Sequence, residues 1–277
     1  MATAAEKLAY DEKSHPIREK IKEFEKDIEK FKVELRAIPA ENKVDICKKK
    51  LEIIDLLTGV ISMNIAVSLI SIEKLNLKNE SFLNEARKSL YVILQYFEEM
   101  VGKIIDTGFE ENIENLEILD QINDNLQRFA IFQKLGYLLN KVEFLFGDNS
   151  KWKWSFVELS GRLTTAMKNC INFKDLQRDL DPSVPGYPER MNLMNILVSS
   201  LTLAADRYRN KYELTNKRVD DMKCALSLLA FQKRLAIVQN DAELADLCSK
   251  KYDSWNKKLK EDFDEEDRKS KEALRGK

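Results

Sequence analysis

One segment of the chain, from Ile17 to Ile38, repeats an apolar side chain every three or four residues. The repeat consists of Ile17, Ile21, Phe24, Ile28, Phe31, Leu35 and Ile38, spaced alternately by four and three. Nearly every residue between them is charged, so a helix here carries a narrow apolar seam of the coiled-coil kind. Such a helix packs on one partner helix rather than inside a core. Ser14 followed by Pro16 favours a helix start at this point.

We define the seam as the side chains from Ile17 to Leu35 in this repeat. The sequence does not determine which helix packs against it. If the helix pairs between chains, the seam makes a dimer. If it folds back on the next predicted helix, residues 39–77, the molecule is an antiparallel bundle and its partner surface lies elsewhere. The seam is in either case a candidate interaction site.

Breaks between helices are few, because the 277 residues include only eight Gly and five Pro. With 44% apolar residues the chain has enough material for a large core. The fold class predicted is therefore all-α, with about eight helices in an elongated antiparallel bundle and a coiled-coil-like amino-terminal helix. The helices after the first are expected at residues 39–77, 82–105, 109–146, 152–172, 188–214 and 217–239, and from an Asn240–Glu243 capping box past Trp255, with a short helix at 175–180.

A turn at residues 147–150 suggests a division of the chain. We predict an amino-terminal bundle at residues 1–147 and a second bundle at residues 148–262, which could be continuous with the first. The charged residues 263–277 have almost nothing to bury and are expected to form a frayed helix or a flexible tail.

The charge balance, 46 basic against 47 acidic residues, gives a net charge of −1 and argues against nucleic acid as a partner. No basic segment followed by an apolar run starts the chain, and the four cysteines form no metal-binding pattern. We therefore expect reduced cysteines and a cytoplasmic protein. The uncharged run from Leu56 to Ile72 is short and contains polar residues, so we predict a buried central helix and no membrane span.

Motifs for catalysis are missing. His15 is the single histidine, and it stands beside Pro16 at the expected start of a charged helix. No phosphate-binding loop and no Glu-x-x-His pair occurs. We predict no catalytic residue, no cofactor and no metal site.

Three further features are candidates for binding a protein partner. Residues 104–127 hold seven acids and no base, and most of these acids fall on one face of a continuous helix over 109–146. Trp152 and Trp154 lie two residues apart, so they cannot both face one core. Tyr187 stands in the proline-rich loop 181–188. The candidate residues are Glu110, Glu114, Glu117, Asp124, Trp152 and Tyr187. The alternative explanations are a solvated face for the acids, ordinary packing for the tryptophans, and prolines that only set a sharp reversal for the loop of Tyr187.

These observations favour a non-enzymatic helical scaffold or adaptor that acts by protein–protein interaction, with another protein or with itself. The alternative is a helical ligand-binding or regulatory domain with a pocket between the carboxy-terminal helices, lined by the methionine-rich stretch 191–203.

Overall fold

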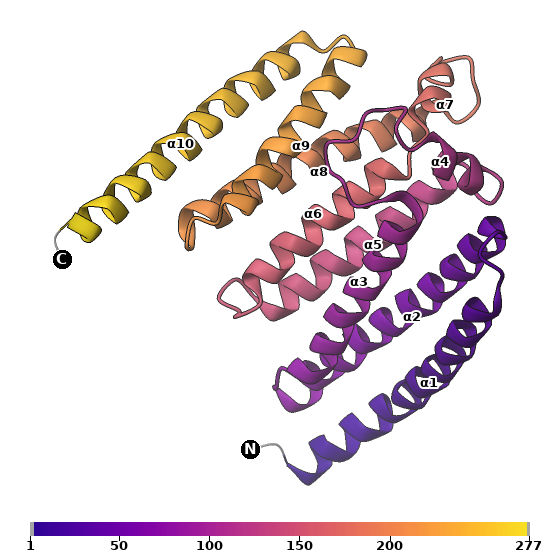
Figure 1. Cartoon of the computed structure of the whole chain (residues 1–277). Coiled ribbons are helices and arrows are strands. Elements are labelled where there is room, and N and C mark those ends of the chain that lie inside the picture. The colour runs from indigo at the N-terminus through magenta and orange to yellow at the C-terminus, as the bar shows by residue number, and fades with distance from the viewer. Residues whose placement is uncertain (1–2, 276–277) are drawn as a thin grey trace. The chain divides into compact units, whose positions relative to one another are not determined.

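The computed structural model describes residues 3–275 and confirms the all-α prediction. Within these residues it contains ten α-helices and no strand, so the helix number exceeds the predicted eight. The helices are α1 (Ala4–Ala37), α2 (Lys43–Leu75), α3 (Glu80–Val101), α4 (Ile113–Asp120), α5 (Asn125–Phe146), α6 (Lys153–Asn169), α7 (Phe173–Arg178), α8 (Tyr187–Leu214), α9 (Val219–Val238) and α10 (Ala242–Arg275) (Figure 1).

Two compact units divide the chain. Unit 1 consists of Met1–Lys103 and Phe109–Arg190, and unit 2 of Ile104–Gly108 and Met191–Lys277. The turn at residues 147–150, predicted as a boundary, therefore lies inside unit 1. The predicted tail 263–277 continues α10 as far as Arg275, and residues 276–277 lie outside the described part of the chain.

In unit 1, α1 and α2 form an antiparallel hairpin. Glu34 lies 2.9 Å from Lys49 near the connecting residues 38–42, and Lys13 lies 3.4 Å from Glu73 near the other end of the hairpin. The two helices approach closely in the middle, where a Cβ atom at Gly59 would lie only 2.6 Å from Cε2 of Phe24. The absence of a side chain at this position therefore makes room for the phenyl ring.

The core of unit 1 lies among α2, α3, α5 and α6, which pack on one another. Its largest fully buried side chains include Ile53, Ile61, Leu83, Ile93, Phe97, Leu135, Phe156 and Leu159. The rings of Phe97 and Phe132 join α3 to α5 with centroids 4.7 Å apart, a favourable distance for aromatic packing.

The start of α1 differs from the prediction. Thr3 caps the helix, its hydroxyl accepts from the Glu6 amide, and the Glu6 carboxylate accepts from the Thr3 amide. Ser14 is therefore an interior residue, fully buried, and Pro16 lies inside the helix. The capping box Thr-x-x-Glu is a stronger start signal than Ser14, because it satisfies two terminal N–H groups at once.

The single helix predicted over residues 109–146 is wrong. Residues 109–112 are not helical, and α4 ends at Asp120 before α5 begins. Asp124 caps α5 by accepting from the Gln127 amide at 2.8 Å. The buried Arg128 holds the turn, since its guanidinium lies 2.7 Å from Asp120 and also donates to the Asn123 carbonyl and to Asn125.

Unit 2 consists of residues 191–214 of α8 together with α9 and α10. Its core cluster joins Tyr212, Met222 and Leu226 to the partly buried Tyr252, Trp255 and Leu259 of α10. The segment 104–108 is held on α9 by Arg234, which lies 2.5 Å from Asp106. The predicted cap of α10 is corrected by one residue, because Asn240 is left-handed, with φ 57°, and Asp241 accepts from the Leu244 amide.

Substitutions at two helical glycines, one in the contact between α1 and α2 and one outside it, are expected to have opposite effects on stability. Gly59→Leu inserts a side chain where Phe24 lies, and we expect it to lower the free energy of unfolding by about 1–3 kcal/mol. Gly136→Ala in α5 is the control, because a Cβ atom there meets nothing within 4 Å. We expect it to raise stability by about 0.5–1 kcal/mol, because alanine has a higher helix propensity than glycine. Urea unfolding followed by circular dichroism measures both, and an unchanged midpoint for Gly59→Leu would contradict the contact.

Candidate interaction surface

The seam of α1 packs against α2 of the same chain. Ile21 and Ile28 are 7% and 4% exposed, and the other four positions of the seam are partly buried. Phe24 lies against Gly59 of α2, and the ammonium of Lys49 lies 4.3 Å from the centroid of the Phe31 ring. This arrangement is the second of the two alternatives, in which α1 folds back on α2.

Phe24→Asp and Phe31→Asp test this arrangement in solution. Each places a carboxylate against α2, so we expect each variant to lose stability by about 2–4 kcal/mol and to lose part of its helical signal. Circular dichroism at increasing urea concentration measures the loss. A variant that keeps its full helical signal and only changes its oligomeric state would instead support pairing of the seam between chains.

The predicted acidic face is divided between separate elements. Glu110 precedes α4, Glu114 and Glu117 belong to α4, and Asp124 caps α5. All four side chains are exposed, and the three glutamates make no ion pair within the described residues. They form no single helical stripe, because the helix is interrupted at the turn that Arg128 holds.

Trp152 and Tyr187 are partly buried against neighbouring residues and do not project freely into solvent. The guanidinium of Arg87, on α3, lies 3.7 Å from the centroid of the Trp152 ring, a cation–π contact that covers one face of the indole. Tyr187 is the half-buried first residue of α8, and its amide donates to the Val184 carbonyl at 3.2 Å. Both residues therefore fit the simpler explanation of ordinary packing.

Sequence reasoning missed a different surface, on the outer side of α5. The segment 129–146 is apolar on nearly every side, a pattern that favours burial, yet Tyr137 and Phe144 are 67% and 75% exposed. They are seven residues apart and share a face with Lys134 and Lys141. The ammonium of Lys141 lies 5.6 Å from the centroid of the Phe144 ring.

This face of α5 lies beside a partly exposed stripe of α2. Lys134 lies 3.5 Å from Asp55, and the Lys78 ammonium, just beyond α2, donates to the carbonyl of Phe146. At 100° per residue, Ser62, Ala66 and Leu69 share the face of α2 that carries Asp55. We call these residues together the α2–α5 surface: Ser62, Ala66, Leu69, Lys134, Tyr137, Lys141 and Phe144.

Helix α2 also meets the length and composition of a membrane span, and within residues 3–275 it is the one helix that does. Of its most apolar window, 56% is buried inside the structure. A core helix of a soluble protein meets the same criterion, so the observation is weak evidence for a span.

A second candidate site is a small cavity in unit 2, with a volume of about 240 Å³. Asp262 of α10 is one of the residues that line it, and one of its carboxylate oxygens accepts from Lys217 and Lys258, both at 2.8 Å. The other oxygen accepts from the Tyr212 hydroxyl at 3.0 Å. Burial by itself raises the pKa of Asp262, but these three hydrogen bonds outweigh it and lower the pKa to about 2.

The low pKa of Asp262 makes unit 2 sensitive to acid. A carboxyl whose folded pKa is depressed stabilises the fold above its unfolded pKa of 3.8, and this contribution is lost as the pH falls through about 2. We expect Asp262→Asn to cost roughly 2 kcal/mol at neutral pH and to flatten the acid dependence. The fluorescence of Trp255, with Trp152 and Trp154 replaced by Phe, follows this unit. Equal acid sensitivity in Asp262→Asn would show that other carboxyls are responsible.

Groups with catalytic potential are dispersed. His15 is exposed on α1, and all four cysteines are free thiols. Burial raises the pKa of the Cys170 thiol to about 12, so this sulfur stays protonated and unreactive. Within the described residues, no group of three or more His, Cys, Asp or Glu side chains is arranged to hold a metal ion.

Comparison with known proteins gives one match. No curated protein and no solved structure is detectably similar to this chain. The sequence pattern of the TP0443 family matches residues 6–263, which include all ten helices except the first two residues of α1 and the last turns of α10. This chain therefore belongs to the TP0443 family.

Proposed function

We propose that this protein is a non-enzymatic helical adaptor that acts by binding another protein. The observation that carries the proposal is the exposure of Tyr137, Phe144 and Leu69 on the α2–α5 surface. Large apolar side chains gathered on one exposed face are a common mark of protein-binding sites, and aromatic residues are frequent among their strongest contacts.

The rigidity of the support favours the same function. Tyr137 and Phe144 project from α5, whose opposite side contributes the buried Phe132, Leu135 and Leu139 to the core. A partner that binds this face meets side chains whose backbone is already ordered, so little conformational entropy is lost. The proposal does not depend on self-association through the seam, because α2 already covers that seam.

The distribution of reactive groups supports a role without chemistry. The one imidazole, on His15, is exposed on a charged helix, and the Cys170 thiol is buried. Four free thiols also support work in a reducing compartment such as the cytoplasm.

Native mass spectrometry of the protein isolated gently from its own cells tests the proposal. We expect a stoichiometric complex with a second protein that disappears in Tyr137→Ser/Phe144→Ser, because that variant removes both aromatic contacts and leaves the core intact. Leu203→Ser is the matched control, since Leu203 is 54% exposed but belongs to α8 of unit 2. A bare protein in every preparation would contradict an adaptor.

A second candidate function is ligand binding by unit 2, and the cavity at Asp262 is the observation that favours it. The cavity lies near the end of α8, next to Tyr212, and not along the methionine-rich stretch 191–203. A small additional mass that stays with the protein in the same spectrum, and is lost in Asp262→Asn, would support this candidate.

A further inference from the structure

We infer that the α2–α5 surface binds an amphipathic helix of a partner protein, and that acidic residues flank the apolar stripe of that helix. The inference rests on the proposed function, because it names the kind of partner that the surface fits. Three observations carry it: the shape of the stripe on α2, its flanking helices and the charges at its borders.

The stripe of α2 is narrow and nearly free of bulk, with Ser62 and Ala66 partly exposed and Leu69 exposed. Ser62 and Ala66 have short side chains, and Leu69 one turn further is 40% exposed. Small residues along a helix let a second helix approach closely, because its ridges fit over the low positions. The stripe from Ser62 to Leu69 spans about two turns, so a second helix could pack closely over roughly 10 Å of its length.

Helices α1 and α5 border this stripe on its two sides. On one side Phe24 of α1 covers Gly59, and Lys13 of α1 reaches Glu73. On the other side Lys134 of α5 reaches Asp55. A third helix laid along α2 would therefore contact α2 beneath it, and Tyr137 and Phe144 at its flank.

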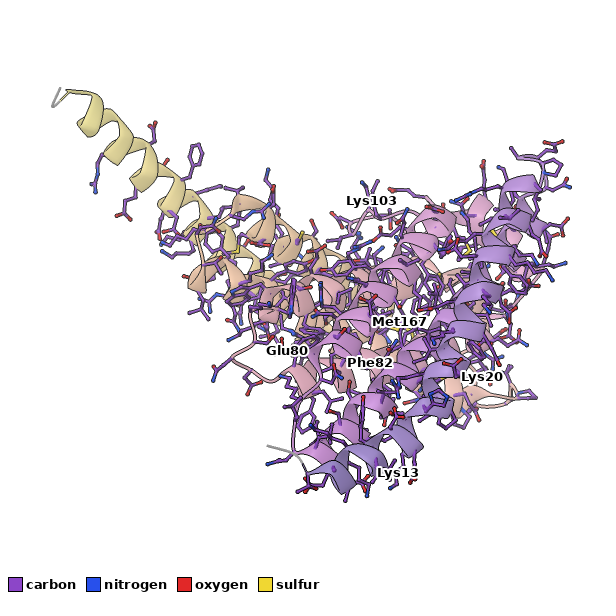
Figure 2. All side chains as sticks on the ribbon, turned by 90° about the horizontal axis from the view of Figure 1, so that it is seen from below. Lys13, Lys20, Glu80, Phe82, Lys103 and Met167 are labelled. Carbon is purple, nitrogen blue, oxygen red and sulfur yellow. The ribbon has the colours of Figure 1, made fainter. Side chains whose placement is uncertain are left out.

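Lysines stand at both borders. Lys13 and Lys20 lie on α1 (Figure 2), where Lys20 lies 5.4 Å from the centroid of the Phe24 ring. Lys134 and Lys141 lie on α5, and Lys141 makes no ion pair within the described residues. Lys134 lies 3.5 Å from Asp55 and Lys13 lies 3.4 Å from Glu73, distances longer than most ion pairs in this structure, whereas Lys20 lies 2.8 Å from Glu23 of its own helix.

These exposed pairs contribute little to stability, so the lysines are available to a partner's carboxylates. With Glu23, which lies 2.8 Å from Lys20, and Lys74, which lies 2.6 Å from Glu73, five lysines against three acids leave the borders positive, although the whole chain has a net charge of −1. A helix with glutamates or aspartates beside its apolar stripe matches this pattern, and charge complementarity of this kind selects the partner and its orientation.

An anionic membrane surface would also attract lysines and aromatic side chains. A protein helix fits better, because Asp55 and Glu73 are 82% and 57% exposed within the same borders. A flat layer of anionic headgroups would press against both carboxylates, whereas a helix can place its own charges beside the lysines alone.

A peptide-display selection on the full chain tests the inference, with a library of helical peptides in which apolar positions are fixed at helical spacing and flanking positions vary. We expect the enriched peptides to carry Glu or Asp at the flanking positions. Their binding, measured by fluorescence anisotropy, should weaken about tenfold or more in Phe144→Asp and in Leu69→Asp.

A charge reversal then separates attraction by the lysines from apolar contact. Lys134→Glu/Lys141→Glu should lose about tenfold affinity for the acidic peptides and gain affinity for peptides with lysine flanks. Lys257→Glu, an exposed lysine on α10, is the control. Circular dichroism checks that every variant keeps its helical signal.

Four results would overturn the inference: no enrichment, enrichment of peptides without acidic flanks, binding that ignores these variants, or co-sedimentation with anionic phosphatidylserine vesicles that depends on the same lysines. Each can be told apart from failure of the proposed function. If a protein complex is seen in native mass spectrometry but the peptide selection fails, the proposed adaptor function stands. Only the inference that the partner is an acidic amphipathic helix is then wrong.

Discussion

Packing around α2 is the interaction on which unit 1 depends. The uncharged run from Leu56 to Ile72 gives α2 more apolar surface than one neighbour can cover, and α1, α3 and α5 each cover part of it. Each buried isoleucine or leucine contributes about 1.5–3 kcal/mol relative to exposure. The hairpin with α1, the contact with α3 and the position of α5 all follow from this requirement.

The same requirement leaves one side of α2 uncovered, between α1 and α5. Helices of about 10 Å diameter cannot surround another helix completely when only a few are present. The stripe is tolerable in water because its residues are small or hydroxylated at Ser62 and Ala66. Stability of the core and availability of the α2–α5 surface thus have a common origin in the excess apolar surface of one helix.

Sequence reasoning predicts the all-α class, the seam of α1 and the burial of α2, because each depends on residues close in sequence. The break before α5 was missed although Asp124 and Gln127 form a capping box, since apolar spacing continues through the turn. The role of the buried Arg128 depends on Asp120 and Asn123, which only the folded turn brings together. The exposure of Tyr137 and Phe144 could not be predicted either, because an apolar segment does not tell which of its sides lacks a neighbour.

The regular repeat of α1 has a consequence for how this helix finds its place. Phe24 and Phe31 are seven residues apart, so sliding α1 by one heptad along α2 would bring a second phenyl ring to Gly59 and keep the apolar seam in contact. The repeat alone therefore does not distinguish the two alignments. The short connection 38–42 and the ion pair between Glu34 and Lys49 select the observed one. Lengthening that connection would allow a shifted hairpin that has the same composition and secondary structure.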